Sequence, residues 1–446
     1  MGCISLQSLH VHSYAIKPIY LVKGPKKCGK STFTRTLLNA LLARYKRVAF
    51  LDCDPGQSEF MPGGFVSLHV IAEPVFGPPY THPTLPFRAH LIAATSPKSS
   101  PNTYLDGVKD LIDAWRVDVM HVPVSSALDE DERVVDTIPL VVNTMGWSKG
   151  LGADLMQKIE QTVEPGQVFA FQTEDGSRHS DPSELLSPHH NTGAVKTHFL
   201  EPAPLSALST NYTPADHRNL SIMSYFHAAF PVPRKLSNRE PYLDPIIAQT
   251  WNTALPLCAI PPYEIDVHAA FDQIVLTGAG SEDVIPNELS RVLNGALVGF
   301  VRLDHQSSFM TDTASQVDIS SVPYVQCQPP PAPAESSCIG LGLIRGVSFP
   351  LISGDIDATA RATLHILTPI PPALLTNARV LVKGEMELPI WGMLDFREFT
   401  NTGDTGGIAG VEKGRVPYLQ WGRVSEGAIG AEKRRVRRNL MRRGQV

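Results

Sequence analysis

The chain has 446 residues, 43% of them hydrophobic and 19% charged, a composition that predicts a globular protein of roughly two or three domains. A formal net charge of -5 argues against general affinity for nucleic acid, and no apolar run is long enough to span a membrane. The six cysteines contain no Cys-x-x-Cys pair, which fits a reduced intracellular protein better than a disulfide or zinc framework.

The first strong motif is a glycine-rich loop near the start of the chain. Residues 1–17 show little pattern and are interpreted as the remnant of an upstream segment. An apolar run at Ile19–Val22 then leads into Gly24-Pro-Lys-Lys-Cys-Gly-Lys-Ser31, which matches the phosphate-binding loop pattern Gly-x-x-x-x-Gly-Lys-[Ser/Thr]. Helical apolar spacing in Thr32–Ala43 completes the expected order of strand, loop and helix. A chance glycine-rich turn is the alternative.

Backbone N–H groups in such a loop surround a polyphosphate, and the following helix offers its positive N-terminal end. We expect Lys30 to neutralise the β- and γ-phosphates of a nucleoside triphosphate and the Ser31 hydroxyl to hold Mg²⁺. The residues expected to bind the nucleotide share this loop and the first turn of the helix: Gly24, Pro25, Lys26, Lys27, Cys28, Gly29, Lys30, Ser31 and Thr32.

Two carboxylates end the next predicted strand, Arg47–Asp52. Asp52 and Asp54 are two residues apart, so we expect them on one side of the strand end, at the sheet edge where ligands bind in open α/β sheets. Motor ATPases and GTPases usually carry their Mg²⁺ aspartate further along the chain. This early position therefore favours a kinase in which a carboxylate accepts a proton from an attacking hydroxyl. Alternatively, both aspartates only cap a turn at Pro55-Gly56.

Apolar runs and helical stretches alternate up to about residue 171, which predicts an α/β fold with a parallel sheet covered by helices on both faces. Strands are predicted at Arg47–Asp52, His90–Thr95, Val117–Val122, Ile138–Asn143 and Gln167–Phe171. Helices are predicted at Tyr104–Trp115, Gly152–Gln161, Thr213–His227 and Leu243–Trp251, with a polar, loop-like stretch at Glu174–Pro204.

Short strands separated by turns follow Pro261 and predict a β-rich C-terminal domain. They are expected at Gln273–Thr277, Gly295–Arg302, Gly340–Arg345, Ala362–Leu367 and Ala378–Lys383. Four segments are predicted along the chain. Residues 1–17 are an N-terminal remnant, and residues 18–255 are a P-loop kinase domain with a lid around 213–230. Residues 256–412 are the β-rich domain, and residues 413–446 are a tail with a basic end.

A glycine-rich loop, Asn143–Gly152, follows the strand predicted at Ile138–Asn143. Its glycines favour a mobile loop that presents Trp147, and Lys149 adds a spare cation. An aromatic side chain on such a rim is suited to stack on a nucleobase. A packing role for Trp147 is the alternative.

Three motifs together resemble the polynucleotide 5′-hydroxyl kinases: Gly24–Ser31, Asp52-Cys-Asp-Pro-Gly-Gln57 and Asn143–Gly152. That family includes the pre-mRNA cleavage-complex kinase and the pre-ribosomal-RNA-processing kinase. Several further segments are more similar to the ribosomal, nucleolar branch of fungal type: Asp216–His227, Leu364–Ile370, Lys383–Pro389, Pro417–Trp421 and the basic C-terminal end. The resemblance covers most of the chain from Ile19 onward.

The resemblance implies a P-loop kinase that uses ATP and Mg²⁺ to phosphorylate the 5′-hydroxyl of RNA. It implies Lys30 as a catalytic cation, Asp54 as general base and Asp52 as an aid at the metal. In the clasp-like loop, Thr144 would fix the Walker lysine or the substrate, and Trp147 would stack on the terminal base. Arg218 on the lid would reach over the transferring phosphoryl group, unless it is only a solvated helix arginine. Two more residues are expected to contact the substrate: Gln57 and Lys149.

The resemblance also implies a partner and a compartment. The RNA end would be left by an endoribonuclease on a pre-rRNA spacer, in the nucleus and nucleolus. The basic run Lys433–Arg443 would dock into that endoribonuclease; a solvated tail, a nuclear-targeting patch and RNA phosphate contact are its alternatives. Two other functions stay open: the messenger- or transfer-RNA branch of the family, and a scaffold that binds ATP without catalysis.

This chain departs from the family pattern in two places. Family members usually carry a large domain before the phosphate-binding loop, whereas this chain starts almost at the first strand. The segment Ala93-Ala-Thr-Ser-Pro97 also replaces the family's small or glycine-containing loop, which affects the expected substrate groove.

Overall fold

The computed structural model describes residues 18–121, 131–172, 195–204, 212–232, 243–304, 322–349 and 361–393. Residues 1–252 and 262–388 form one compact unit, which holds both large sheets, and residues 253–261 and 389–446 form a second. The N-terminal remnant 1–17 and the tail 413–446 lie outside the described residues, and the predicted domain limits stay predictions.

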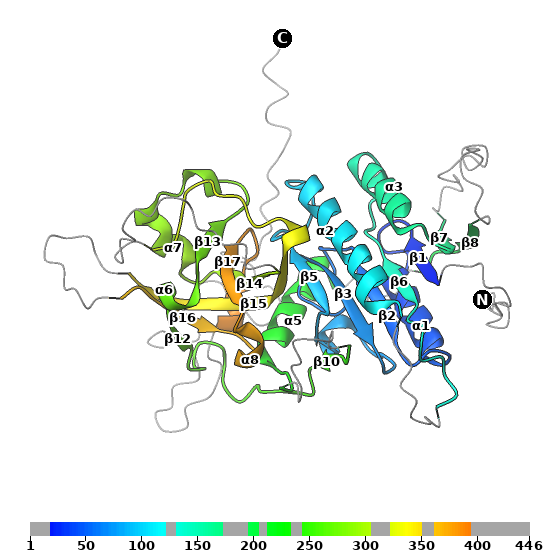
Figure 1. Cartoon of the computed structure of the whole chain (residues 1–446), viewed down its shortest axis with the longest axis horizontal. Helices are drawn as coiled ribbons and strands as arrows, with labels where there is room; N and C mark the ends of the chain where they lie inside the picture. The colour runs from blue at the N-terminus through cyan, green and yellow to red at the C-terminus, as the bar shows by residue number, and fades with distance from the viewer. Residues whose placement is uncertain are drawn as a thin grey trace, which may run out of the picture. The chain divides into compact units, whose positions relative to one another are not determined.

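Seven strands form the first sheet, in the order β5-β3-β2-β6-β1-β7-β8 (Figure 1). Strands β2, β6, β1, β7 and β8 run parallel, while β3 is antiparallel to β2 and β5 is antiparallel to β3. In chain order the strands are β1 (Ile19–Lys23), β2 (Val48–Asp52), β3 (Phe65–Ile71), β5 (Arg88–Leu91), β6 (Leu140–Asn143), β7 (Gln167–Phe171) and β8 (Lys196–Leu200). The sheet is therefore parallel except at one edge.

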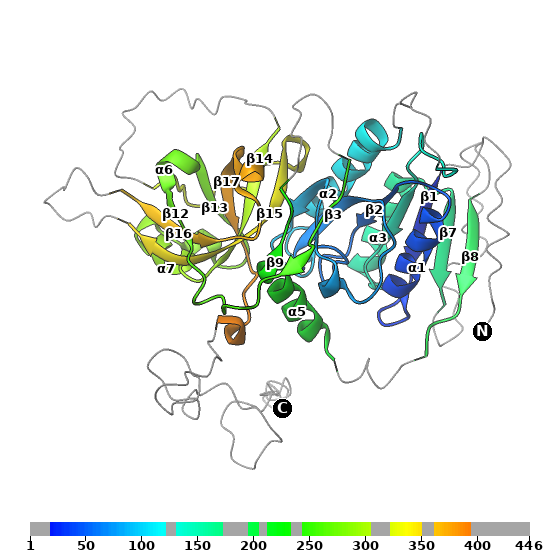
Figure 2. The same cartoon turned by 90° about the horizontal axis from the view of Figure 1, so that it is seen from below.

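Helices cover both faces of this sheet, because alternate strand residues point to opposite sides. The helices are α1 (Lys30–Leu42), α2 (Pro101–Ala114) and α3 (Leu151–Val163). Leu21 of β1 belongs to the core that also contains α2 and α3, whereas its neighbour Val22 packs with α1. Figure 2 shows the same strands between α1 and the α2–α3 pair. The predicted α/β fold is confirmed.

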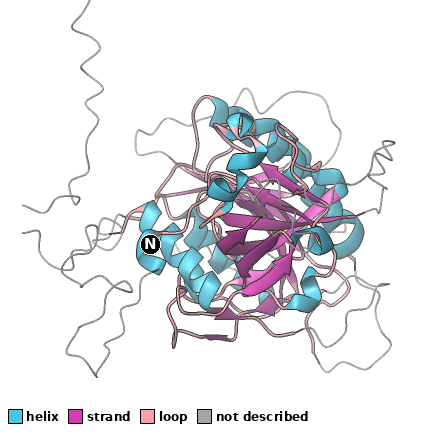
Figure 3. Cartoon of the chain, turned by 90° about the vertical axis from the view of Figure 1, so that its left-hand side faces the viewer, coloured by secondary structure: helices cyan, strands magenta, loops and turns pink. Residues whose placement is uncertain are grey.

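Six strands form the second sheet, in the order β12-β16-β15-β14-β17-β13. The strands are β12 (Tyr263–Asp266), β13 (Gln273–Leu276), β14 (Leu297–Leu303), β15 (Ser336–Ser348), β16 (Thr363–Leu367) and β17 (Ala378–Lys383). Neighbours are antiparallel except β13 and β17. Three short helices accompany the sheet: α6 (Val267–Ala270), α7 (Leu289–Leu293) and α8 (Pro372–Leu375) (Figure 3). The predicted β-rich segment after Pro261 is confirmed.

Specific contacts join the two sheets. Arg88 on β5 pairs with Asp110 of α2 through Nε (2.5 Å) and with Asp304, just after β14, through Nη2 (2.5 Å). On helix α5 (Pro214–His227), the Tyr225 hydroxyl accepts the backbone N–H of Leu341 on β15 at 2.9 Å. Tyr225 is buried, so this hydrogen bond fixes α5 against the second sheet.

Helix α5 begins where the sequence predicts. Thr213 is its N-cap, Pro214 takes the first helical position, and the side chains of Thr213 and Asp216 complete a capping box. The predicted helices around α1, α2 and α3 are likewise confirmed, with boundaries shifted by a few residues.

Two predicted elements are wrong. The strand predicted at Val117–Val122 is in fact a π-helical turn, Trp115–Val119, that continues α2; Val119 is buried while Val117 is 81% exposed. The helix predicted at Leu243–Trp251 is replaced by two short strands, β10 (Ile246–Ile247) and β11 (Thr250–Trp251). Pro245 and the β-branched residues after it disfavour a helix there.

The sequence also missed three strands. β3 and β12 were not predicted, and β8 lies inside the stretch expected to be a loop. The expected strand at His90–Thr95 is β5, which starts and ends earlier. Two further short strands complete the fold: β4 (Thr84–Leu85), paired with β10, and β9 (Ala228–Ala229), paired with β11. Among the described residues, no helix is long and apolar enough to cross a membrane.

Replacing Tyr225 with Phe should destabilise the protein by about 1–3 kcal/mol, because the buried N–H of Leu341 loses its acceptor. Urea denaturation of the wild type and Tyr225→Phe measures this difference. Tyr212→Phe removes a hydroxyl from a half-exposed ring and serves as the matched control, with no expected change. Equal midpoints for all three proteins would contradict the assignment.

Burial also predicts how stability depends on pH. The His69 ring on β3 stacks near Phe60, and burial lowers the pKa of His69 from 6.5 to about 3. The folded state therefore binds fewer protons than the unfolded state in this range, and the free energy of unfolding should fall as pH drops from about 6.5 to 3. In His69→Gln the free energy of unfolding should fall less as the pH drops. In His121→Gln, which changes an exposed position, it should depend on pH as in the wild type.

Candidate active site

The phosphate-binding loop connects β1 to α1 in a conformation that needs glycine. Gly24 and Gly29 have φ values of 151° and 96°, and Gly29 directly precedes the first residue of α1, Lys30. A Cβ on Gly24 would lie 2.6 Å from Cβ of Phe171, so no larger residue fits. Burial raises the pKa of the Cys28 thiol, which keeps it protonated and makes it a packing residue of the loop. The predicted strand–loop–helix arrangement is present.

Lys30 is held by its own loop. Its Nζ donates a 2.7 Å hydrogen bond to the carbonyl oxygen of Pro25, and the side chain is buried. Burial lowers the pKa of Lys30, while the neighbouring Cys28 and Asp54 act to raise it. The resemblance implied that Thr144 fixes this lysine or the substrate. In the structure Lys30 bonds to the Pro25 carbonyl instead, and the Thr144 hydroxyl donates to the carbonyl oxygen of Val22 at 2.6 Å.

Asp52 ends β2 as a fully buried carboxylate surrounded by N–H donors. Its Oδ1 accepts from Asn143 Nδ2 (3.1 Å) and from the backbone of Asp54 (3.2 Å), and its Oδ2 accepts from the backbone of Glu59 (2.7 Å). Burial raises its pKa to about 8, and these hydrogen bonds counteract part of that effect. Asn143 also lies 3.5 Å from the hydroxyl of Thr34, which links Asp52 to α1.

Asp54 follows in a tight turn. Its Oδ1 accepts from the backbone N–H groups of Gly56 (2.9 Å) and Gln57 (3.3 Å), which is the turn-capping role considered from the sequence. Within the described part of the chain, no hydrogen bond reaches Oδ2. Burial raises the pKa of Asp54, while Gly56 N–H and the charge of Lys30 lower it. A carboxylate with a raised pKa and one uncommitted oxygen is suited to accept a proton.

The clasp-like loop packs directly on the phosphate-binding loop. A Cβ on Gly146 would lie 2.7–3.0 Å from the Cγ, Cα and N atoms of Lys26, so the two backbones touch. Trp147 is half-buried, and a Cβ on Gly152 would meet its Cβ at 2.3 Å. The structure therefore brings the second and third predicted motifs, Asp52–Gln57 and Asn143–Gly152, to the mouth of the first.

Two lysines flank the Trp147 ring: Nζ of Lys26 lies 5.7 Å and Nζ of Lys98 lies 5.4 Å from its centroid. Lys98 was not predicted; it stands in the Ser-Pro-Lys-Ser-Ser-Pro segment that leads from β5 into α2. Lys149 is exposed on the clasp-like loop, and Gln57 is exposed beyond Asp54. Lysines and an aromatic ring together suit a phosphate chain with stacked bases.

The aliphatic part of the Arg218 side chain, on α5, lies beside Gly63. Its Cδ and Cγ lie 3.4 and 3.7 Å from the place of a Cβ on Gly63, whose neighbour Gly64 donates to the carbonyl oxygen of Pro55 at 2.7 Å. Among the described residues, no carboxylate pairs with its guanidinium. The structure thus places Arg218 beside the loop that carries Asp54, as expected for the lid arginine.

Hard oxygen donors are what Mg²⁺ requires, and Ser31 on the first turn of α1 offers one. Three N–H groups already occupy the oxygens of Asp52, and its role at the metal stays a prediction. The described residues contain no cluster of three or more His, Cys, Asp or Glu side chains that would hold a metal alone. A metal here would depend on the phosphates for its remaining ligands.

Gly146→Ala should weaken nucleotide binding by about 10-fold or more, because the added methyl group displaces the backbone of Lys26. Titration with a fluorescent nucleoside triphosphate measures the dissociation constant. Ser148→Ala changes an exposed residue of the same loop and should bind as the wild type does. Unchanged affinity in Gly146→Ala would show that the two loops do not touch during binding.

The chain is similar to known proteins over most of its length. Residues 24–228 match the family described as the mRNA cleavage and polyadenylation factor CLP1 P-loop. A polynucleotide 5′-hydroxyl-kinase GRC3 of Cryptococcus neoformans var. neoformans serotype D is 36% identical over 446 residues, covering 95% of this chain and 56% of the relative. The grc3 kinase of Schizosaccharomyces pombe is 27% identical, covering 96% and 55%.

A solved structure of the extended interface between Pcf11p and Clp1p shares the fold, with a TM-score of 0.51 and 15% identity; the match covers 86% of this chain and 77% of that chain. The chain spans about half the length of the curated relatives it matches. The resemblance seen in the sequence is confirmed. Over residues 24–228 the chain matches the CLP1 P-loop family, and over most of its length it is similar to the GRC3 polynucleotide 5′-hydroxyl kinases.

Proposed function

We propose that this chain transfers the γ-phosphate of ATP to the 5′-hydroxyl of RNA. The observation that carries the proposal is the convergence of Lys30, Asp54 and Arg218 at one end of the sheet, beside the loop that bears Trp147. A nucleotide-binding scaffold does not need a carboxylate with an uncommitted oxygen at that place. A kinase does, because its acceptor hydroxyl must lose a proton.

In this mechanism, the RNA 5′-hydroxyl oxygen attacks the γ-phosphorus in line, and the bond to the bridging oxygen breaks to release ADP. Asp54 Oδ2 accepts the hydroxyl proton. Lys30 leaves the Pro25 carbonyl to contact the phosphates, and Arg218 neutralises charge on the γ-phosphate oxygens. Mg²⁺, held by Ser31 and the phosphates, would supply further positive charge. Trp147, with Thr144 beneath it in the same loop, orients the acceptor end.

The finer part of the proposal concerns the biological substrate. We place the chain in pre-rRNA processing and ribosome biogenesis, acting on a 5′-hydroxyl left in an internal transcribed spacer by a partner endoribonuclease, in the nucleus and nucleolus. The names of the GRC3 relatives and the basic run Lys433–Arg443 support this branch. That run, proposed to dock into the endoribonuclease, lies outside the described residues.

The CLP1-type P-loop and the Clp1p fold favour a second candidate, the messenger- or transfer-RNA branch of the same family. Affinity purification with the full chain separates the two. Capture of an endoribonuclease, lost on deletion of residues 433–446, supports the ribosomal branch. Capture of cleavage-complex subunits instead would overturn it.

Incubation with γ-labelled ATP and 5′-hydroxyl RNA, with and without the partner nuclease, tests the transfer. Asp54→Asn should lower the transfer rate about 100- to 10,000-fold, because the general base is lost, and Lys30→Ala should abolish label transfer. Asp106→Asn, on the exposed side of α2, is the matched control and should transfer normally. ATP binding without transfer, even with the partner present, would favour a non-catalytic scaffold.

A further inference from the structure

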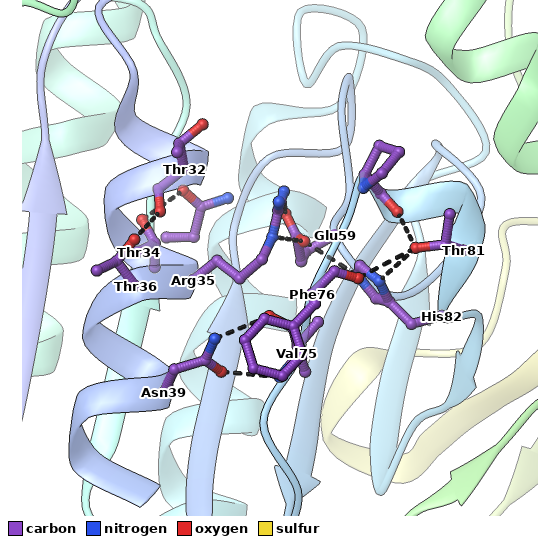
Figure 4. A network of polar contacts seen from close by, with 12 residues as sticks. Thr32, Thr34, Arg35, Thr36, Asn39, Glu59, Val75, Phe76, Thr81 and His82 are labelled. Carbon is purple, nitrogen blue, oxygen red and sulfur yellow. Dashed lines mark hydrogen bonds and ion pairs between the residues drawn. The ribbon is translucent and has the colours of Figure 1, made fainter. Parts of the chain in front are cut away.

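A second buried carboxylate lies behind the acidic loop. The Glu59 side chain is only 2% exposed, and its carboxylate lies between Arg35 of α1 and His82 of a neighbouring turn (Figure 4). Its backbone N–H donates the 2.7 Å hydrogen bond to Oδ2 of Asp52. Glu59 therefore contacts the proposed catalytic loop through its backbone and the rest of the fold through its side chain.

Arg35 of α1 holds this carboxylate from one side. Its Nε donates to Oε1 of Glu59 at 2.7 Å and its Nη2 donates to Oε2 at 3.3 Å, a bidentate pair. Arg35 lies on the helix that starts at Lys30, next to Thr34, which reaches Asp52 through Asn143. Adjacent residues of α1 thus reach the same carboxylate, Asp52, by two routes.

His82 holds Glu59 from the other side, with Nε2 at 3.0 Å from Oε1. His82 ends the turn Pro79–Thr81, and its Nδ1 lies 3.2 Å from the Thr81 hydroxyl. The same turn is bonded to α5, because the Ser224 hydroxyl donates to the carbonyl oxygen of Tyr80 at 2.6 Å. Helix α5 carries Arg218, so Glu59 also connects to the lid arginine.

We propose that Glu59, clamped by Arg35 and His82, is a positioning residue that sets Asp54 relative to Lys30 and Arg218 before the acceptor binds. Glu59 connects α1, which starts at Lys30, with the loop that carries Asp54 and with a turn bonded to α5, the helix that carries Arg218. The inference rests on the proposed kinase function, and it assigns Glu59 no contact with substrate.

Stability alone does not require Glu59, Arg35 and His82 at this place. Burying a carboxylate costs free energy that a bidentate arginine and a histidine only offset, and an apolar cluster of the same volume is often as stable. What the ion pair adds is direction: two fixed hydrogen bonds orient the backbone of residue 59, and so the N–H that holds Asp52.

The chain contains a matched control. Asp110 of α2 also accepts from an arginine Nε (Arg88, 2.5 Å) and a histidine Nε2 (His90, 2.7 Å), although its side chain is 15% exposed against 2% for Glu59. Among the described contacts Asp110 itself has none to the Asp52–Gln57 loop; α2 reaches that loop through Tyr104, whose hydroxyl donates to the carbonyl oxygen of Cys53 at 2.7 Å. Asp110→Asn therefore breaks a comparable arginine–histidine clamp whose carboxylate does not hold the loop.

Single-turnover transfer from saturating ATP to 5′-hydroxyl RNA tests the proposal. Glu59→Gln should lower this rate about 10- to 100-fold while the dissociation constant for ATP stays within about 2-fold of wild type. Asp110→Asn should leave the rate unchanged. Arg35→Gln should resemble Glu59→Gln, and the double variant should be no slower than the slower single variant, because both act through one pair. A double variant whose rate is reduced by the product of the two single reductions would contradict the proposal.

Hydrogen–deuterium exchange of the wild-type and variant chains gives a readout that needs no activity. Glu59→Gln should speed exchange in peptides covering residues 52–60, where the amides of Asp54, Gly56 and Glu59 are bonded to Asp52 and Asp54, and Asp110→Asn should not. If the wild type transfers no phosphate, the kinase proposal fails, and exchange alone decides whether Glu59 positions the loop. Unchanged exchange in Glu59→Gln would overturn the inference.

Discussion

A carboxylate without solvent is costly unless hydrogen bonds replace the lost water, and Asp52 meets that condition with three N–H groups from different parts of the chain. Those groups come from the turn at Asp54, from Glu59 and from Asn143 at the end of β6. Satisfying the oxygens of this one buried carboxyl group therefore fixes the ends of β2 and β6 relative to each other. The acidic loop and the clasp-like loop both start from these strand ends, and the phosphate-binding loop starts from β1 between β6 and β7.

The parallel strands explain why the loops that carry the proposed site residues lie at one edge of the sheet. β1, β2 and β6 all point the same way, so the loops that follow them emerge together at their carboxyl ends. Close packing also fixes these loops: Gly146 lies against Lys26 with no space for a side chain larger than hydrogen, and Gly63 lies in van der Waals contact with Arg218. Burial at this edge lowers the pKa of Lys30 and raises that of Asp54, and each charge opposes the effect on the other.

Local patterns predicted much of this arrangement. The phosphate-binding loop, the acidic pair and the capped helix α5 were read from neighbouring residues, because glycines, strand ends and caps leave short-range signals. Long-range pairing left none: the antiparallel strand β3 and the strand character of β8 depend on neighbours distant in the sequence. The same limit hid the place of Lys98 beside Trp147 and the clamp on Glu59, whose partners lie 24 and 23 residues away.

The central claim is that the site couples ATP consumption to phosphorylation of an RNA 5′ end. Parallel quantification of ADP and 5′-phosphorylated RNA in one reaction measures this coupling most directly. The account predicts one ADP for each new 5′-phosphate, and no ADP when the RNA already carries a 5′-phosphate. ADP formation that is independent of the acceptor would contradict it, because Asp54 would then serve a hydrolase and not a kinase.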